Sequence, residues 1–393
     1  MKLEVPGFVA GAVAAGIKKD GKKDLGIICS ETPACAAGVF TTNKVQAAPV
    51  LLDKERIKSG RCQAIVANSG NANACTGKRG MEDAKAVSLA AATALGIPEE
   101  LLLVASTGVI GLHLDVDSIK AAIPGLAGYL NAAGLNDVAE AIMTTDTFPK
   151  AVSKQGHVGD KIFTIAAVAK GAGMIHPDMA TMLCFVCTDI VAEPDLLERA
   201  LKDAVGKSFN SITVDGDTST NDTVLLLANG LSGLHLEEAS IATAFQSALD
   251  EVLLTLALQI VKDGEGATKE VSVCIEGASD EGDARRVAYT VANSPLVKTA
   301  LFGEDANWGR IMAAIGRAGA LVNSETIDIS FDDVCVVKDG QGCGEKAEGD
   351  AAAVLKNDRF TITVNLKMGS GTATVHTCDL STDYVRINAD YRS

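Results

Sequence analysis

Residues 161–191, KIFTIAAVAKGAGMIHPDMATMLCFVCTDIV, contain two strand-like runs joined by a short turn. KIFTIAAVAKGAGMI (161–175) and TMLCFVCTDIV (181–191) are apolar and rich in β-branched residues, and HPDMA connects them. We therefore expect two consecutive strands. Thr181 begins the second run, where a β-branched residue can simply start a buried strand. Alternatively, the chain breaks before Thr181 and exposes its hydroxyl and a new amine as a catalytic unit.

Strands and helices alternate on both sides of this pair. The stretch 64–77 predicts a strand that runs into an amide-rich loop, and 101–111 predicts a buried strand. Three segments have helical periodicity or end signals, namely 81–96, 194–209 and 241–264. FTITVNL and TATVHTC flank GSG at 369–371 and predict a closing hairpin. Elements interleaved in this way predict a layered α/β fold.

Composition limits the classes of function. The 393 residues are 47% hydrophobic and 22% charged, which is typical of a soluble globular protein. A net charge of −15 argues against nucleic acid or an anionic membrane as a main partner. No run of about 18 apolar residues predicts a membrane span. The ten cysteines are scattered, which fits a reducing cytoplasm.

Common catalytic motifs are missing from the sequence. Cys184 and Cys187 form one C-x-x-C, but no second pair completes a zinc site, so two core thiols and no metal site are expected. The glycine-rich stretches 264–269 and 340–346 match neither phosphate-loop pattern. No G-x-S-x-G elbow is present. Threonine chemistry remains.

A threonine hydroxyl is a poor nucleophile unless a base activates it. If the bond between Ala180 and Thr181 is cut, the new α-amine titrates near pH 8 and can act as that base. Attack of the Thr181 hydroxyl on the preceding carbonyl would also explain how the chain cuts itself.

Such chemistry needs donors for the oxyanion. In ASTGVIG (105–111), Thr107 offers a hydroxyl and Gly108 offers a backbone N–H that no side chain blocks. The alternative is that Gly108 only ends a strand.

Seven motifs, found in order along nearly the whole chain, carry a family resemblance. They are NSGNANACTG (68–77), ASTGVIG (105–111), MTTDTFPK (143–150), AKGAGMIHPDMATML (169–183), DGDTSTNDT (215–223), KDGEGATK (262–269) and ANWGRI (306–311). The set resembles the glutamate N-acetyltransferase family, the ornithine acetyltransferases of cyclic arginine biosynthesis.

The resemblance implies a self-cleaved enzyme. Cleavage between Ala180 and Thr181 would give an α chain, 1–180, and a β chain, 181–393, which together form one interleaved catalytic body. The implied fold is the layered α/β sandwich of the ornithine acetyltransferase type, assembled as an α2β2 heterotetramer. Thr181 matches the acetyl-carrying nucleophile, and Thr107 and Gly108 match the oxyanion pair.

The resemblance also implies the substrate contacts, which are Thr144, Lys170, Thr181, Glu265, Asn388 and Ser393. At Ser393 the family often has threonine, so this position keeps the hydroxyl and lacks the methyl. By charge, Lys170 suits the α-carboxylate of N-acetylornithine and Glu265 its side-chain ammonium, although these two roles can be exchanged.

The implied reaction moves an acetyl group from N2-acetylornithine to glutamate without a bound cofactor. Some family members also use acetyl-CoA as a donor, and no residue here decides that point. One alternative is a self-processing amidohydrolase or aminopeptidase with the same N-terminal threonine. Another is a small-ligand binding or scaffold protein that has no catalytic activity.

Overall fold

The computed structural model describes residues 3–176 and 182–390, which form two compact units. Unit 1 contains residues 3–210 and 217–260 apart from that gap, and unit 2 contains residues 211–216 and 261–390. The predicted division at 180/181 concerns covalent chains, and it stays a prediction.

Unit 1 is built on eight strands in the order β4-β3-β2-β8-β7-β6-β5, with β1 paired to β2. Their bounds are β1 (Phe8–Val13), β2 (Leu25–Phe40), β3 (Arg61–Asn71), β4 (Leu102–Val109), β5 (Lys150–Val158), β6 (Lys161–Lys170), β7 (Leu183–Thr188) and β8 (Thr223–Ala228). The consecutive strands β6 and β7 confirm the interpretation of residues 161–191, and they pair antiparallel.

Strand β2 joins two layers of the sheet. Its first part pairs with β1 and β3, whereas its last part pairs with β8. The register shifts between Cys29 and Ala34, where three exposed residues interrupt the buried pattern. Such an irregularity lets one strand pass from one sheet to the other.

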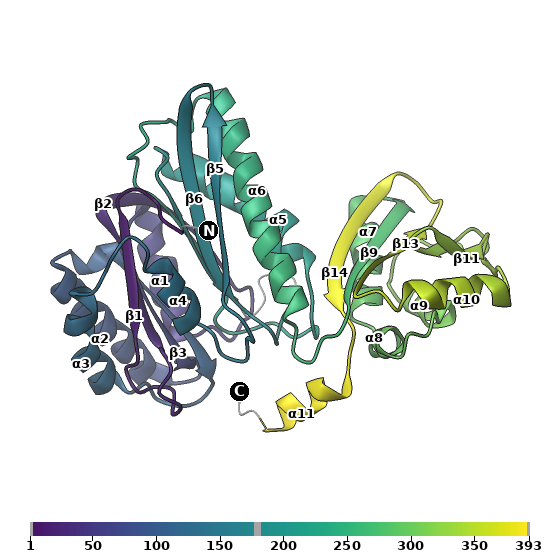
Figure 1. Ribbon diagram of the computed structural model, residues 1–393, viewed down its shortest axis with the longest axis horizontal. Coiled ribbons are helices and arrows are strands. Elements are labelled where there is room, and N and C mark those ends of the chain that lie inside the picture. The colour runs from purple at the N-terminus through teal and green to yellow at the C-terminus, as the bar shows by residue number, and fades with distance from the viewer. Residues whose placement is uncertain (1–2, 177–181, 391–393) are drawn as a thin grey trace. The chain divides into compact units, whose positions relative to one another are not determined.

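Alternate residues of the strands face two different cores. Ile65 and Leu103 share one hydrophobic cluster with Phe185 and Leu225, so the β3/β4 layer packs face to face on the β7/β8 layer. The residues between them in sequence, such as Val66, face the opposite side and pack against helices. Unit 1 therefore confirms the predicted layered α/β sandwich (Figure 1).

Helices cover the outer faces of the sandwich. They are α1 (Ala48–Arg56), α2 (Gly77–Leu95), α3 (Val116–Ala127), α4 (Leu135–Ala141), α5 (Pro194–Lys207) and α6 (Ala239–Lys262). The predicted end of α2 is confirmed, because Gly96 has φ +68° and its N–H caps the helix. The helix begins four residues earlier than predicted.

Helix α6 is long and apolar enough to cross a membrane by length and composition alone. Phe245, Leu249 and Leu256 are nevertheless fully buried, and the Phe245 ring lies 5.8 Å from that of Phe163 on β6. Figure 1 shows α6 alongside β5 and β6, which is the arrangement of a core helix.

Unit 2 has a six-stranded sheet in the order β12-β11-β10-β13-β9-β14. Its strands are β9 (Glu270–Ala278), β10 (Asp328–Phe331), β11 (Val334–Lys338), β12 (Gln341–Gly342), β13 (Arg359–Asn365) and β14 (Gly371–Cys378). Its helices are α7 (Glu281–Ala292), α8 (Pro295–Phe302), α9 (Trp308–Gly316), α10 (Glu345–Val354) and α11 (Thr382–Asp390). Val273, Val287 and Ile362 belong to one core between sheet and helices.

The predicted closing hairpin is wrong. β13 and β14 both exist, but β9 lies between them, parallel to β13 and antiparallel to β14. The connection between them crosses the end of β9, where the N–H groups of Met368 and Gly369 both donate to the Gly277 carbonyl. Alternating apolar residues predict a strand, but they do not identify its partner when a distant segment can insert.

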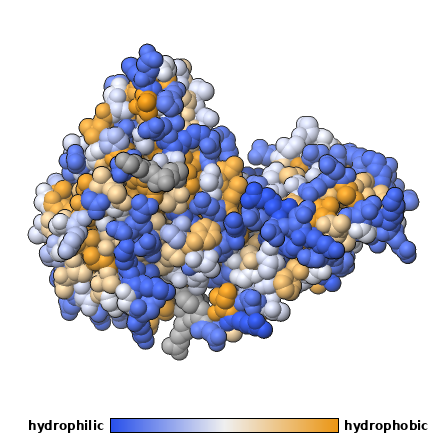
Figure 2. All heavy atoms as spheres, in the orientation of Figure 1, coloured by the Kyte–Doolittle hydropathy of each residue, from blue (hydrophilic) through white to orange (hydrophobic). Residues whose placement is uncertain are grey.

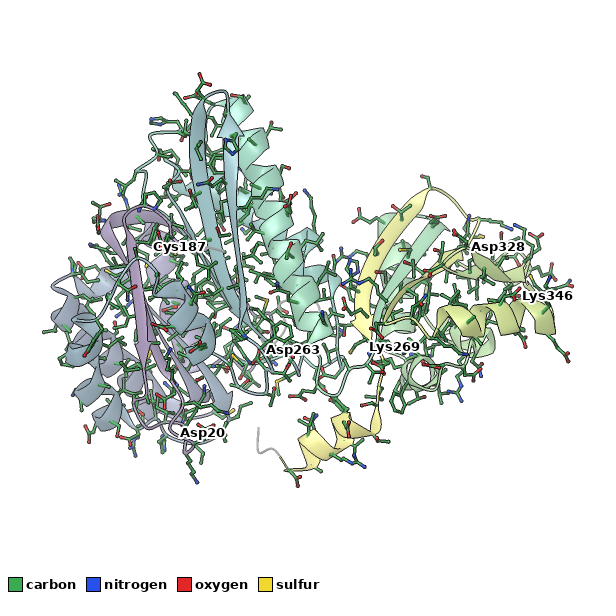
Figure 3. All side chains as sticks on the ribbon, in the orientation of Figure 1. Asp20, Cys187, Asp263, Lys269, Asp328 and Lys346 are labelled. Carbon is green, nitrogen blue, oxygen red and sulfur yellow. The ribbon has the colours of Figure 1, made fainter. Side chains whose placement is uncertain are left out.

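The surface is mixed in polarity. On the face in Figure 2, hydrophilic side chains are interspersed with hydrophobic ones over both units. Figure 3 places Cys187 within the sheets of unit 1. Cys184 and Cys187 are both completely buried, as expected for core thiols, and burial raises the pKa of each.

Candidate functional site

The ends of β3 and β4 bring the proposed oxyanion residues to one edge of unit 1. The two strands are parallel, and Gly108 lies opposite Gly70 at their carboxyl ends. Gly108 has φ +130°, and a Cβ atom there would lie 2.4 Å from the Gly70 carbonyl carbon. A glycine is therefore required by the backbone at this position, whatever its role in chemistry.

Lys170 lies beside Thr107 even though their strands are not neighbours in the sheet. The Lys170 ammonium donates to the Thr107 hydroxyl oxygen over 3.5 Å, and both side chains are buried. Because the lysine donates to this oxygen, the hydroxyl hydrogen of Thr107 is left to donate elsewhere. The geometry places a hydrogen-bond donor beside a positive charge, an arrangement that can stabilise an oxyanion and bind a carboxylate next to it.

The Asp146 carboxylate connects the backbone at Thr144 to the backbone next to Lys170, and both residues are predicted substrate contacts. Its Oδ2 accepts the N–H of Thr144 at 2.9 Å, and its Oδ1 accepts the N–H of Gly171, the residue after Lys170, at 2.7 Å. The Lys150 ammonium is 2.8 Å from Oδ1, and both side chains of this ion pair are fully buried. Burial alone would raise the pKa of Asp146, but Lys170 and Lys150 lower it to about 2.

Replacing Asp146 with asparagine should destabilise unit 1 by about 3–5 kcal/mol at pH 7, because Lys150 then loses the carboxylate with which it is buried. The folded pKa of about 2 lies below the ordinary 3.8, so the carboxylate contributes stability above pH 3.8 and loses it towards pH 2. In urea unfolding, the difference between wild type and variant should shrink below pH 4.

The control for this prediction is Asp20→Asn in unit 1. Asp20 and its partner Lys22 both face solvent, so this change should cost far less than the change at Asp146. If the Asp146→Asn difference stayed constant from pH 7 to pH 2, the charge of Asp146 would not be its cause.

Two further predicted contacts lie together in unit 2. The Asn388 side-chain amide donates to Glu265 Oε2 at 2.7 Å. Gly266 has φ +70° and packs against the start of α11, where the Ser381 hydroxyl donates to the Gly266 carbonyl at 2.6 Å. The turn KDGEGATK and the C-terminal helix therefore present one acidic and one amide side chain side by side.

Other predicted residues lie outside the described residues, namely Ala180, Thr181 and Ser393. Met182, which follows Thr181 in the chain, is the nearest described residue. Its N–H donates to Asp222 Oδ1 at 2.9 Å.

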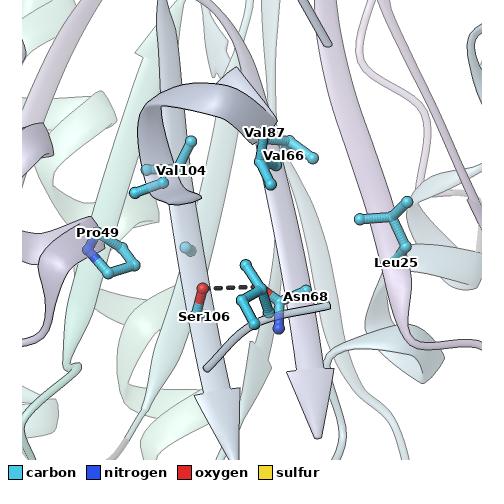
Figure 4. Close-up of a pocket in the computed structure, with 10 residues that line it drawn as sticks. Leu25, Pro49, Val66, Asn68, Val87, Val104 and Ser106 are labelled. Carbon is cyan, nitrogen blue, oxygen red and sulfur yellow. Dashed lines mark hydrogen bonds between the residues drawn. The ribbon is translucent and has the colours of Figure 1, made fainter. Parts of the chain in front are cut away.

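Next to Thr107, the side chains are packed in a buried interior. The Ser106 hydroxyl, next to Thr107, donates to Asn68 Oδ1 at 2.6 Å (Figure 4). Both residues border a cavity of about 10 Å³, roughly the space of one water molecule. A larger recess of about 270 Å³ beside α5 includes none of the predicted site residues in its lining.

Within residues 3–176 and 182–390, no group of three or more His, Cys, Asp or Glu side chains could hold a metal ion. Sequence reasoning named neither Asp146 nor Asp222 nor Asn221, although each lies inside a motif that carried the family resemblance. The available signal was a charged or amide residue inside such a motif, surrounded by threonines and serines that suit a buried hydrogen-bond network.

Comparisons with known proteins identify the family of the chain. The family model described as the ArgJ family matches residues 9–393. The arginine biosynthesis bifunctional protein ArgJ of Geobacter sulfurreducens is 54% identical over 393 residues, covering 100% of both chains. Its counterpart from Syntrophotalea carbinolica is also 54% identical, over 394 residues, with the same coverage.

A crystal structure also resembles this chain. The solved ArgJ chain from Bacillus halodurans is 46% identical, with a TM-score of 0.50. The match covers 98% of that chain but 53% of this one.

Proposed function

The chain belongs to the ArgJ family, and from that premise we propose that it moves an acetyl group from N2-acetylornithine to glutamate through an acetyl-threonine at Thr181. It is an acyltransferase of arginine biosynthesis. The observation that carries the finer proposal is the pairing of Thr107 with Lys170 at the edge where β4 ends.

The proposed reaction has two halves. The Thr181 hydroxyl attacks the acetyl carbonyl while its own α-amine takes the hydroxyl proton. The Thr107 hydroxyl and the Gly108 N–H stabilise the oxyanion, and the amine then protonates the nitrogen of departing ornithine. In the second half the neutral amine of glutamate attacks the acetyl-threonine ester, the Thr181 α-amine takes a proton from the attacking nitrogen and passes it to the departing Thr181 oxygen, and N-acetylglutamate leaves.

The position of Lys170 supports its assignment to the α-carboxylate. In N2-acetylornithine the acetylated nitrogen and the carboxylate are bonded to the same carbon, so a cation beside the oxyanion donor lies within reach of both. Glutamate offers the same carboxylate. We propose that Glu265 and Asn388 bind the side-chain ammonium of ornithine, and that Thr144 and Ser393 bind other polar groups of the substrate.

Self-cleavage before Thr181 is part of the proposal. The Bacillus halodurans chain is matched almost entirely by 53% of this chain, so it is itself about half as long, whereas the Geobacter relative has full length. A half-length chain is what cleavage near the middle would give. Residues 181–393 make up just over half of the present chain.

Active purified protein should therefore run as two chains on a denaturing gel. N-terminal sequencing of the larger piece should begin Thr-Met-Leu, because cleavage creates the free amine that the mechanism uses. A fully active preparation that remains one polypeptide would contradict the mechanism.

Several further properties belong to the same proposal. The chemistry needs neither a bound cofactor nor a metal ion, so exhaustive dialysis, with or without a chelator, should leave the rate unchanged. We propose acetyl-CoA as a second donor, assembly as an α2β2 heterotetramer and a cytoplasmic location. The location is supported by the ten cysteines, all of which are free thiols. Light scattering of the purified enzyme tests the assembly, because it measures the molar mass and an α2β2 heterotetramer has twice the mass of one full-length chain.

A further inference from the structure

Two adjacent buried residues, Asn221 and Asp222, lie in the loop before β8. The backbone of this loop is held at two points. The Ala47 N–H donates to the Thr220 carbonyl at 3.0 Å, and the Thr41 N–H donates to the Asp222 carbonyl at the same distance. These two hydrogen bonds fix the backbone that carries Asn221 and Asp222.

Asn221 links the residue that follows β3 to a residue inside β4. Its side-chain amide donates to the Ala72 carbonyl at 2.6 Å and to the Ser106 carbonyl at 2.8 Å. The Ser106 carbonyl belongs to the peptide group whose N–H is that of Thr107. Both amide hydrogens are used, and a carboxylate in the same place would have none to donate. The hydrogen bond from Asn221 therefore fixes the orientation of the peptide group between Ser106 and Thr107, directly before the proposed oxyanion donors.

Asp222 holds the start of β7. Its Oδ1 accepts the Met182 N–H at 2.9 Å, and the Thr223 N–H donates to the Met182 carbonyl at 3.1 Å. Met182 is thus held at both of its backbone polar groups. Asp222 Oδ2 is buried as well, and the side-chain hydroxyls of Ser219 and Thr41 stabilise the carboxylate. Burial raises the pKa of Asp222 well above its usual range, although the Met182 N–H and the Lys170 charge favour the carboxylate.

We propose that Asn221 and Asp222 are positioning residues that hold the Thr107–Gly108 edge and the residue after Thr181 in one rigid frame. Asn221 orients the oxyanion donors, and Asp222 acts on Thr181 through Met182. The inference rests on the proposed function, because it assigns the pair to the same nucleophile and oxyanion residues. Displacing reacting groups by about 1 Å can cost about 10²-fold in rate, so positioning has a measurable effect.

Asn221→Asp keeps the shape of the side chain and removes both donors. Measured per cleaved enzyme, kcat should fall by about 10²-fold, while KM should change by less than about threefold. If Asn221→Asp cannot be purified folded, Asn221→Ser tests the same point, since its short hydroxyl cannot reach both carbonyls. A wild-type kcat in either folded variant would overturn the role of Asn221.

Asp222 is tested through the rate of self-cleavage. Asp222→Ala should slow it by at least about 10-fold, whereas Asp222→Asn, which retains an oxygen for the Met182 N–H, should cleave like wild type. The pH profile of Asp222→Asn should also match that of wild type, because hydrogen bonding rather than charge is required. Equal cleavage by Asp222→Ala and wild type would overturn its role.

The matched control is Asp53→Ala. Asp53 is equally buried in unit 1 and accepts the N–H of Val104 on β4 at 3.0 Å, but it does not contact Met182 or Thr107 in the described structure. The Asp53→Ala variant should lower the urea concentration at the midpoint of unfolding without changing the rate of self-cleavage or kcat. If it impaired both as strongly as the loop variants, general destabilisation would replace positioning as the explanation. A wild-type chain that never cleaves would overturn the proposed function instead.

Discussion

Thr181→Ala should remain a single uncut polypeptide with acetyl transfer reduced by at least about 10⁴-fold. The variant lacks the hydroxyl that attacks both the preceding carbonyl and the acetyl group, and removing a nucleophile typically costs this much or more. Losing a threonine hydroxyl and methyl is a small change for the fold, so the protein should stay soluble and folded. A denaturing gel and an assay with N-acetylornithine and glutamate measure both effects.

Thr181→Ser is the matched control for this variant. Serine keeps a hydroxyl next to the new amine, so the chain should still cut itself and turn over, although more slowly. Transferase activity that survives in Thr181→Ala would mean that Thr181 only starts a strand, which is the alternative that the sequence leaves open.

Thr107→Ala should lower kcat by about 10²–10³-fold with little change in KM. Loss of one oxyanion donor costs this much in other acyl-transfer enzymes because the donor acts mainly in the transition state. Lys170 would remain in place, so the positive charge beside the oxyanion is retained. Steady-state kinetics with each substrate varied in turn measure the effect.

The control is Thr107→Ser, which removes the methyl but keeps the hydroxyl, and it should retain most of kcat. An effect of Thr107→Ala confined to KM would move Thr107 from the oxyanion hole to substrate binding. Equal losses in the alanine and serine variants would point to packing of the buried methyl, since Thr107 is almost fully buried.

Local sequence patterns predict the elements well where the cause is local. The strands around residues 161–191 follow from apolar runs, and the end of α2 follows from the glycine at 96, whose φ of +68° suits that residue. The layered class follows from the alternation of strands and helices.

Features that depend on distant segments could not be predicted in this way. The insertion of β9 between β13 and β14 depends on pairing across about 90 residues of sequence, which periodicity does not encode. The same holds for Asp146, which joins the backbones at Thr144 and Gly171, and for Asn221, which links β3 to β4. Each acts through hydrogen bonds that exist only after the sandwich has formed.

The predicted residues are brought together within each unit. Thr107 and Lys170 meet in unit 1, and Glu265 and Asn388 meet in unit 2. Thr107, Lys170 and Glu265 lie in the motifs that carry the family resemblance, and Asn388 was named from the same resemblance outside those motifs. Neither the hydrophobic pattern nor the spacing between the four residues would have identified them. The family resemblance points to residues by their chemical role, whereas hydrophobic periodicity reports only which residues are buried.

The covalent acetyl-enzyme gives the most direct test of the central claim. Purified enzyme is mixed with N-acetylornithine in the absence of glutamate, and the intact mass of each chain is measured before and after glutamate is added. We expect the chain that begins at Thr181 to gain one acetyl group, located on Thr181 by peptide mapping, and to lose it as N-acetylglutamate forms. Hydrolysis of N-acetylornithine as fast without glutamate as with it, and no acetylated chain, would contradict the account and identify an amidohydrolase.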